Sequence, residues 1–288
     1  MRVLPLVVSV LALVLARSVA AVDITTCGQS VGDAATGVLQ VDLDCTGAVG
    51  VCLQPGANDQ DVSCTSDAIC HAVRDPCANA AVLLGAGAVL QLNGHTITGA
   101  GVLCSAAGTC SVTGPGSIVA APVGILARKK IVASGLTVDG GVFGIVSRRG
   151  GAILTNLSLT DNSGDGIWSW KGTIRATGVT ATGNGDSGIY ATLKPVIVRD
   201  STASGNGNHG VDGYPIRALA LTAQGNAGAG IVSAKTLSAR DSTLTGNGIA
   251  FEGLDVVSAR RPRVLNTVCD HSRNIGEGGG TWGVCAAD

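Results

Sequence analysis

Aliphatic and turn-forming residues recur along the middle of the chain with one common period. A glycine followed by an aliphatic residue returns every 20 to 23 residues, from Gly101-Val102 to Gly253-Leu254. An asparagine stands four residues before the glycine in four repeats, at Asn162, Asn184, Asn206 and Asn226, and Asn247 and Asn274 extend the series less regularly. Two independent columns with the same period indicate an internal repeat.

Each repeat holds two or three short runs of β-forming residues separated by Gly, Asn and Asp, and none holds a helix-length amphipathic pattern. One repeat cannot bury its apolar side alone, but repeats stacked at ~4.8 Å can. The sequence therefore predicts an all-β fold, a right-handed parallel β-helix of at least eight coils. One internal column should contain Ile125, Ile145, Ile167, Ile189, Val211, Ile231 and Leu254.

The asparagine column should form a ladder of side-chain amides along one turn of the solenoid. The glycines beside it are expected to supply the positive φ that such a turn needs. Strand alternation then sorts the other side chains, because the residue after each internal aliphatic points outward and the next one points inward.

The two ends of the chain differ from the repeats. Residues 1–20 combine a basic start, an apolar run and a small-x-small site, which predicts a signal peptide, secretion and no membrane insertion. We expect a Cys-rich N-terminal cap at 21–81, the β-helix at 82–268 and a C-terminal cap at 269–288. Ten cysteines predict up to five disulfides, with Cys104 joined to Cys110 and Cys269 joined to Cys285. Pairing within the N-terminal cap stays open, and the spacing predicts no metal site.

Composition narrows the functional classes. With 43 glycines, 2% aromatic and 14% charged residues, the chain suits a narrow β core and not a disordered segment. A formal net charge of −1 gives no indication of nucleic-acid binding. Nothing in the sequence points to oligomer formation.

The repeats, together with the segment Leu90-Gln91-Leu92-Asn93-Gly94-His95-Thr96-Ile97, resemble the β-helix repeats of pectate-lyase-like and related secreted carbohydrate-active proteins. The resemblance covers about residues 82–280. It implies the fold and an extracellular or cell-wall polysaccharide partner, but it does not choose a reaction, because this architecture hosts many activities. The paired Asp-Asp motif expected of polygalacturonases is absent.

Aromatic side chains gather on one predicted outer surface. Trp168, Trp170, Tyr190 and Tyr214 fall in two outward columns of three adjacent repeats. Flat rings with a polar edge suit stacking against sugars, so these four residues are the predicted ligand-binding residues. A basic ridge follows them, which suits an anionic polymer but equally suits a solvated turn edge that deters aggregation: Arg128, Lys129, Lys130, Arg148, Arg149, Lys171, Lys194, Lys235, Arg260, Arg261 and Arg263.

Acidic residues and one histidine lie just before the same strands. A glycoside hydrolase would use two carboxylates, and Asp186 and Asp212 fall on adjacent repeats beside His209. A polysaccharide lyase would instead need Ca²⁺, with Asp165, Asp186 and Asp212 as ligands and Lys194 as the base. The predicted catalytic residues are therefore Asp186, His209, Asp212 and Lys194, with no cofactor unless a lyase binds Ca²⁺. The alternative is that the acids have no catalytic role, because Asp and Asn before Gly are common turn residues.

Two non-catalytic functions compete with these. The aromatic surface could contact another protein, as in a structural or adhesive surface protein. A Thr-x-Thr array before the asparagines, in the segments 158–160, 180–182, 202–204, 222–224 and 243–245, is similar to ice-binding surfaces. Threonine is also a common outward β residue, and Ser and Gln interrupt the array, so ice binding is the remote alternative.

Overall fold

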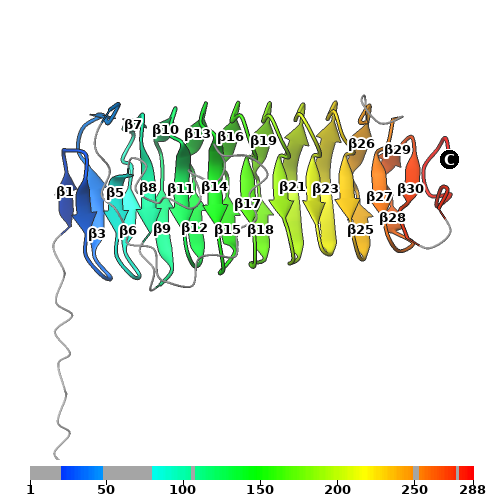
Figure 1. The fold of residues 1–288 in the computed structure, drawn as a ribbon, viewed down its shortest axis with the longest axis horizontal. Helices are drawn as coiled ribbons and strands as arrows, with labels where there is room; N and C mark the ends of the chain where they lie inside the picture. The colour runs from blue at the N-terminus through cyan, green and yellow to red at the C-terminus, as the bar shows by residue number, and fades with distance from the viewer. Residues whose placement is uncertain (1–20, 48–79, 105–107, 249–252, 277–278) are drawn as a thin grey trace, which may run out of the picture.

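The computed structural model describes residues 21–47, 80–104, 108–248, 253–276 and 279–288. The predicted signal peptide and Cys52, Cys64, Cys70 and Cys77 lie outside these ranges. The described residues form a single elongated solenoid of short strands running from one end of the molecule to the other (Figure 1). These ranges contain no helix, and so none long and apolar enough to cross a membrane.

The strands form three faces along the solenoid. Face 1 is an 11-stranded sheet; faces 2 and 3 together make a 19-stranded sheet, because β21 and β23 each run through both. Face 1 contains β2 (Gln29–Val31), β5 (Ala80–Leu84), β8 (Gly101–Cys104), β11 (Val123–Ala127), β14 (Phe143–Ser147), β17 (Ile167–Ser169), β20 (Ile189–Ala191), β22 (Val211–Gly213), β24 (Ile231–Ser233), β27 (Val256–Ser258) and β30 (Ser272–Asn274).

The other two faces follow in each coil. Face 2 contains β1 (Val22–Ile24), β3 (Thr36–Leu39), β6 (Val89–Gln91), β9 (Cys110–Thr113), β12 (Ile131–Ser134), β15 (Ala152–Thr155), β18 (Ile174–Thr177), the first parts of β21 (Val196–Ser204) and β23 (Ile216–Gln224), β25 (Leu237–Arg240) and β28 (Arg263–Leu265). Face 3 contains β4 (Leu43–Asp44), β7 (Thr96–Thr98), β10 (Ser117–Val119), β13 (Thr137–Asp139), β16 (Ser158–Thr160), β19 (Thr180–Thr182), the second parts of β21 and β23, β26 (Thr243–Thr245) and β29 (Val268–Cys269).

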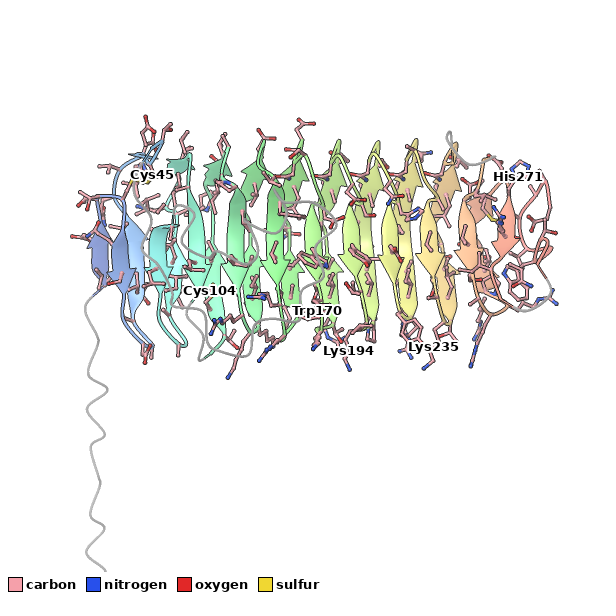
Figure 2. All side chains as sticks on the ribbon, viewed as in Figure 1. Cys45, Cys104, Trp170, Lys194, Lys235 and His271 are labelled. Carbon is pink, nitrogen blue, oxygen red and sulfur yellow. A yellow bond between two sulfur atoms is a disulfide. The ribbon has the colours of Figure 1, made fainter. Side chains whose placement is uncertain are left out.

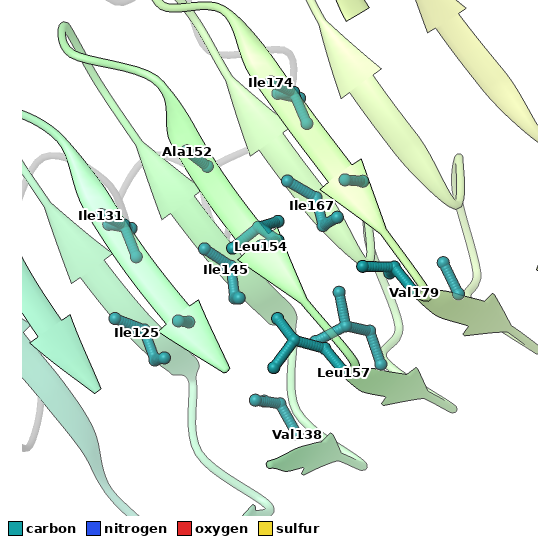
Figure 3. Close-up of a cluster of buried hydrophobic side chains, with 14 of the residues drawn as sticks. Ile125, Ile131, Val138, Ile145, Ala152, Leu154, Leu157, Ile167, Ile174 and Val179 are labelled. Carbon is teal, nitrogen blue, oxygen red and sulfur yellow. The ribbon is translucent and has the colours of Figure 1, made fainter. Parts of the chain in front are cut away.

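Stacked aliphatic side chains fill the interior. Ile125, Ile145 and Ile167 occupy the same register position in β11, β14 and β17, and none of them is exposed (Figure 3). A second column rises opposite them from face 2, including Ile131 and Ile174. Burial of one such side chain stabilises the fold by about 1.5–3 kcal/mol, so the repeated columns supply the main driving force for stacking. The parallel β-helix and its predicted coil number are confirmed.

The asparagine ladder forms as predicted, but inside the solenoid. Asn162, Asn184, Asn206, Asn226 and Asn247 are all buried, and the side-chain amide of each donates to the side-chain oxygen of the next residue along the stack at 2.8–3.0 Å. From Asn184 onward each amide also donates to a backbone carbonyl. The ladder therefore satisfies the polar groups of a buried turn.

The glycine before each internal aliphatic has a steric role that differs from the predicted one. A Cβ added to Gly188 would lie 2.8 Å from the Asn206 Nδ2 and 2.9 Å from the Gly210 carbonyl oxygen. The positive φ instead occurs at the residue directly before the ladder asparagine, as at Gly183 (67°) and Gly205 (64°). The glycines of the Gly-Ile column are therefore required for close contact between coils.

The predicted columns fail at the last repeat. Val256 is the residue that pairs with Ile231, whereas Leu254 is partly exposed. Val256 stands nine positions after Asn247, whereas Ile167 stands five positions after Asn162. This four-residue insertion moves Asp255 into the interior, where its Oδ1 accepts the Asn247 amide at 2.8 Å and ends the ladder. The assignments of Leu254 to the core, of Asp255 to the outer surface and of Asn274 to the ladder are therefore wrong.

Disulfides close both ends of the described chain. Cys27 is joined to Cys45, Cys104 to Cys110 and Cys269 to Cys285. Cys104 and Cys110 are buried and join the end of β8 to the start of β9 within one coil. Paired strands begin at Val22, since β1 pairs with β3 and β2 pairs with β5. The first coil thus lies within the segment that we assigned to the N-terminal cap.

Candidate functional site

The outward column of face 1 changes chemistry along the solenoid. In register order it contains Leu83, Leu103, Leu126, Val146, Trp168, Tyr190, Asp212, Val232, Val257 and Arg273. An apolar stretch thus leads into two rings and a carboxylate, followed by a second apolar stretch. We place the candidate site where the column changes from apolar side chains to Trp168, Tyr190 and Asp212.

Trp168 and Tyr190 form the centre of the aromatic strip. They are register partners on β17 and β20, and both are partly buried. The Trp168 Nε1 donates to the Thr192 hydroxyl at 3.2 Å. Burial raises the pKa of the Tyr190 hydroxyl, and a hydrogen bond with Thr192 opposes this rise. Thr192, which sequence reasoning did not single out, therefore holds both rings.

The upstream edge of the strip is apolar. The Trp168 ring centroid lies 5.9 Å from that of Phe143. Trp168 and Trp170 pack against a cluster of outward-facing but buried side chains that includes Leu126 and Val146. The two tryptophans are therefore both a wall of the site and a cover for the strands beside them.

Lysines lie over aromatic rings at the edge of face 1 where its strands end. The Lys171 Nζ lies 4.3 Å from the Trp170 ring centroid, and the Lys235 Nζ lies 5.4 Å from that of Tyr214. Trp170, Lys194 and Lys235 line one edge of the solenoid (Figure 2). Tyr214 leaves the column predicted for it, because its N–H donates to the Lys194 carbonyl in the following turn and not to β20. Exposed Lys194 makes no ion pair among the described residues.

A column of polar residues precedes the strands of face 1. The Asp165 Oδ1 accepts the Ser187 N–H at 3.0 Å, and one residue before Ser187 the Asp186 Oδ1 accepts the Asn208 amide at 2.9 Å. The His209 Nδ1 accepts the Ala229 N–H at 2.9 Å. Because Nδ1 serves as an acceptor, the neutral ring carries its proton on Nε2.

The carboxyls of this cluster share one electrostatic field. Burial raises the pKa of Asp165 well above its ordinary value, and Asp186 and Asp212 raise it further. Burial also raises the pKa of Asp212 to about 6; the Gly213 N–H opposes this rise, and the Asp186 charge adds to it. Burial lowers the pKa of His209, against the influence of Asp186. The predicted residues Asp186, His209 and Asp212 are thus brought together with Asp165, while Lys194 lies beyond the opposite end of β20.

A concavity of about 340 Å³ continues the site downstream. Its lining includes His209, Val232, Leu254, Val257 and Arg273. Sequence reasoning missed it because the insertion before Val256 displaced the expected columns. The face therefore offers rings, acids and an apolar hollow in succession along the axis.

The predicted Ca²⁺ ligands can be compared with the clustering of His, Cys, Asp and Glu side chains. No group of three or more His, Cys, Asp or Glu side chains with suitable placement occurs in the part of the chain that the structure describes. Asp165, Asp186 and Asp212 do not form such a group, and Ca²⁺ binding by a lyase stays a prediction.

The threonine array lies on face 3. One outward column carries a hydroxyl at eight successive levels: Thr96, Ser117, Thr137, Ser158, Thr180, Thr202, Thr222 and Thr243. The neighbouring column is mixed, since Val119, Asp139 and Gln224 interrupt it. Ice binding stays an untested alternative.

Comparison with known proteins adds a family. Residues 123–268 match the family model described as right handed beta helix region, and this span contains every predicted ligand-binding and catalytic residue. No curated protein matches the sequence. Among solved structures, the chain is similar to the crystal structure of the Dettilon tailspike protein, at 13% identity and a TM-score of 0.43. The similarity covers 93% of this chain and 58% of the tailspike chain, so the chain spans less than two thirds of that protein's length.

Proposed function

The chain belongs to the right-handed beta helix family, and from this premise we propose that it is an extracellular protein that binds an extended polysaccharide along face 1. The observation that carries the proposal is the register pairing of Trp168 with Tyr190, both fixed through Thr192. Rings held in this way offer apolar surface for the C–H faces of sugars and lose little side-chain entropy on binding. The three disulfides among the described residues support an oxidising compartment.

The strip and its surroundings suit a polymer that runs parallel to the solenoid axis. Successive coils repeat at ~4.8 Å, which is close to the length of one sugar unit in an extended chain. The concavity around Val232 and Val257 extends the surface beyond Tyr190 and Asp212. Lys171 and Lys235, which lie over Trp170 and Tyr214, would favour a polymer carrying acidic groups.

The binding prediction concerns the double variant Trp168→Ala/Trp170→Ala. We expect its affinity for glycans recognised by the wild type to fall about tenfold or more, because both rings are removed from the strip. The measurement is a glycan array followed by calorimetry on the positive glycans. Trp168→Phe/Trp170→Phe is the matched control, since it retains flat rings and should retain most of the affinity.

Two results would count against this site. Glycan binding that survives in the alanine variant would place the site elsewhere on the molecule. A complete lack of glycan binding by the wild type would favour the structural or adhesive function, in which face 1 contacts another protein.

Polysaccharide cleavage is the second candidate function, and the observation that favours it is the acid cluster. A carboxyl with a pKa of about 6, such as Asp212, can donate a proton near neutral pH. Asp186, held by Asn208, would serve as the second carboxylate, and the His209 Nε2–H would be available to a bound sugar. Hydrolysis suits these groups, because Asp212 can donate a proton and Asp186 supplies a second carboxylate.

The reaction can be distinguished by its products. We expect incubation of the mature protein with pectate, alginate and neutral polysaccharides to produce new reducing ends without ultraviolet absorbance, equally with and without Ca²⁺. Ca²⁺-dependent formation of an absorbing, unsaturated uronate would instead select a lyase with Lys194 as the base. No product from any substrate would leave face 1 as a binding surface alone.

A further inference from the structure

Face 2 carries an arginine in each of five consecutive coils. These residues are Arg175 on β18, Arg199 on β21, Arg217 on β23, Arg240 on β25 and Arg263 on β28. All five are exposed, in a chain whose formal net charge is −1. Positive charge is therefore concentrated along this part of the molecule, away from the aromatic strip on face 1.

The arginines alternate between two outward columns. Arg175, Arg217 and Arg263 belong to one column, in which Ile197 and Ser238 occupy the intervening levels. Arg199 and Arg240 belong to the other column, in which Thr177, Leu219 and Leu265 fill the remaining levels. No arginine lies directly above another in the next coil, so successive arginines occupy diagonal positions of the sheet, ~7–8 Å apart along the backbone.

Ion pairing within the described part of the chain involves only one of the five arginines. Arg240 forms an ion pair with Asp241, with an Nε–Oδ2 distance of 3.1 Å. Among the described residues, Arg175, Arg199, Arg217 and Arg263 have no ion-pair partner. Like charges at this spacing repel one another within a Debye length of ~10 Å. An anionic ligand would remove this repulsion.

A groove with a volume of about 380 Å³ lies along the same arginines. Arg175, Arg199 and Arg217 line it, and Ile197 and Leu219 lie between them. The groove crosses four coils, from β15 to β23. It therefore combines an apolar floor with charges placed on both sides of a line parallel to the axis.

We propose that face 2 is a second binding site, for an extended acidic polysaccharide with one carboxylate on each sugar. From β18 to β28 each coil presents one arginine, which gives one for every ~4.8 Å of axial rise. This spacing is comparable to the length of one sugar unit. Guanidinium groups bind carboxylates through paired hydrogen bonds, and Ile197 and Leu219 offer contact to the C–H faces of the sugars. The groove contains no aromatic side chain on which nucleic-acid bases could stack.

The site does not depend on the proposed function of face 1. It uses other strands and other residues, and it needs no catalysis. The test is therefore performed in two backgrounds, the wild type and the Trp168→Ala/Trp170→Ala variant, so that loss of the aromatic strip leaves face 2 unchanged.

The experiment measures binding of polygalacturonate at low ionic strength by calorimetry. We expect the Arg199→Gln/Arg217→Gln variant to bind at least about tenfold more weakly in both backgrounds, because two charge-assisted contacts are lost. The charge-matched control is Arg260→Gln/Arg261→Gln, which alters two exposed arginines at the end of the basic ridge, outside the four coils of the groove. It should weaken binding less than the groove variant does, because its side chains do not line the groove. Added salt should weaken wild-type binding more steeply than binding by the groove variant.

Three results would overturn the proposal. The first is an equal loss of affinity in the groove variant and in the charge-matched control, which would show unspecific attraction. The second is the absence of polygalacturonate binding in the aromatic-strip variant when thermal unfolding shows that the protein is folded. The third is tighter binding of a short DNA duplex than of polygalacturonate, which would assign the groove to a different polymer.

Discussion

Replacement of Asn206 by alanine is expected to lower the free energy of unfolding by about 4–5 kcal/mol. The Asn206 side chain accepts the N–H and the amide of Asn184 at 3.1 and 3.0 Å, and it donates to Asn226 at 2.9 Å and to the Ala181 carbonyl at 3.2 Å. Only 2% of the residue is exposed, so water cannot replace these bonds. Each unsatisfied buried group costs about 1–3 kcal/mol, and the variant creates several.

The loss can be measured by urea unfolding followed through tryptophan fluorescence. Asn208→Ala is the matched control: it removes an asparagine two residues away, whose amide makes one exposed bond to Asp186. This control should cost less than about 1 kcal/mol. Equal effects of the two substitutions would contradict a structural role of the ladder.

Replacement of Asp212 by asparagine should stabilise the protein and remove the proposed hydrolytic activity. Burial raises the pKa of Asp212 to about 6, so the folded state holds this proton more tightly than the unfolded chain does. The resulting stabilisation is complete below about pH 4 and is lost as the pH rises through about 6. At pH 7.5 the buried charge should cost about 2 kcal/mol after allowance for partial solvent access, and Asp212→Asn should recover it.

The same substitution removes the proposed proton donor, so we expect polysaccharide hydrolysis to fall by at least ~10²-fold. Stability is measured by unfolding at pH 3.5 and at pH 7.5, and activity by the release of reducing ends. Asp200→Asn, at an exposed turn aspartate, is the charge-matched control, and it should alter neither quantity. A stability gain that is equal at both pH values would show that Asp212 titrates normally.

The fold could be predicted because the sequence repeat has a constant spacing wherever the coils of the structure have a constant length. The spacing from Asn162 to Ile167 is repeated up to Ile231, and over this span every predicted internal aliphatic is buried. The prediction failed at Leu254 because the pair Gly253-Leu254 matches the Gly-aliphatic pattern even though the turn before it is four residues longer. From the sequence, either Leu254 or Val256 could be the internal residue. Val256 is internal because Asp255 is buried at the end of the ladder, where it accepts the Asn247 amide.

The site could be predicted less completely. The outward orientation of Trp168 and Tyr190 follows directly from strand alternation. The proximity of Asp186 and Asp212 follows from their positions on adjacent repeats. The burial of Asp165 depends on how three coils pack at one turn, which spacing does not encode. The sequence did not reveal the arginine columns of face 2, and Arg263 was assigned to the basic ridge. These arginines alternate between two columns, so their sequence intervals are irregular until the register is known.

The ladder has a direction, and this direction gives the molecule an electrical polarity. From Asn162 onward each amide points its oxygen toward the N-terminal end and its NH₂ group toward the C-terminal end. Aligned amides add their dipoles and polarise one another. The positive pole of this array faces Asp255, whose other oxygen accepts the Asp270 N–H at 2.6 Å. A carboxylate is thus placed where an anion best offsets a row of parallel dipoles, as acidic side chains do at the N-terminus of an α-helix.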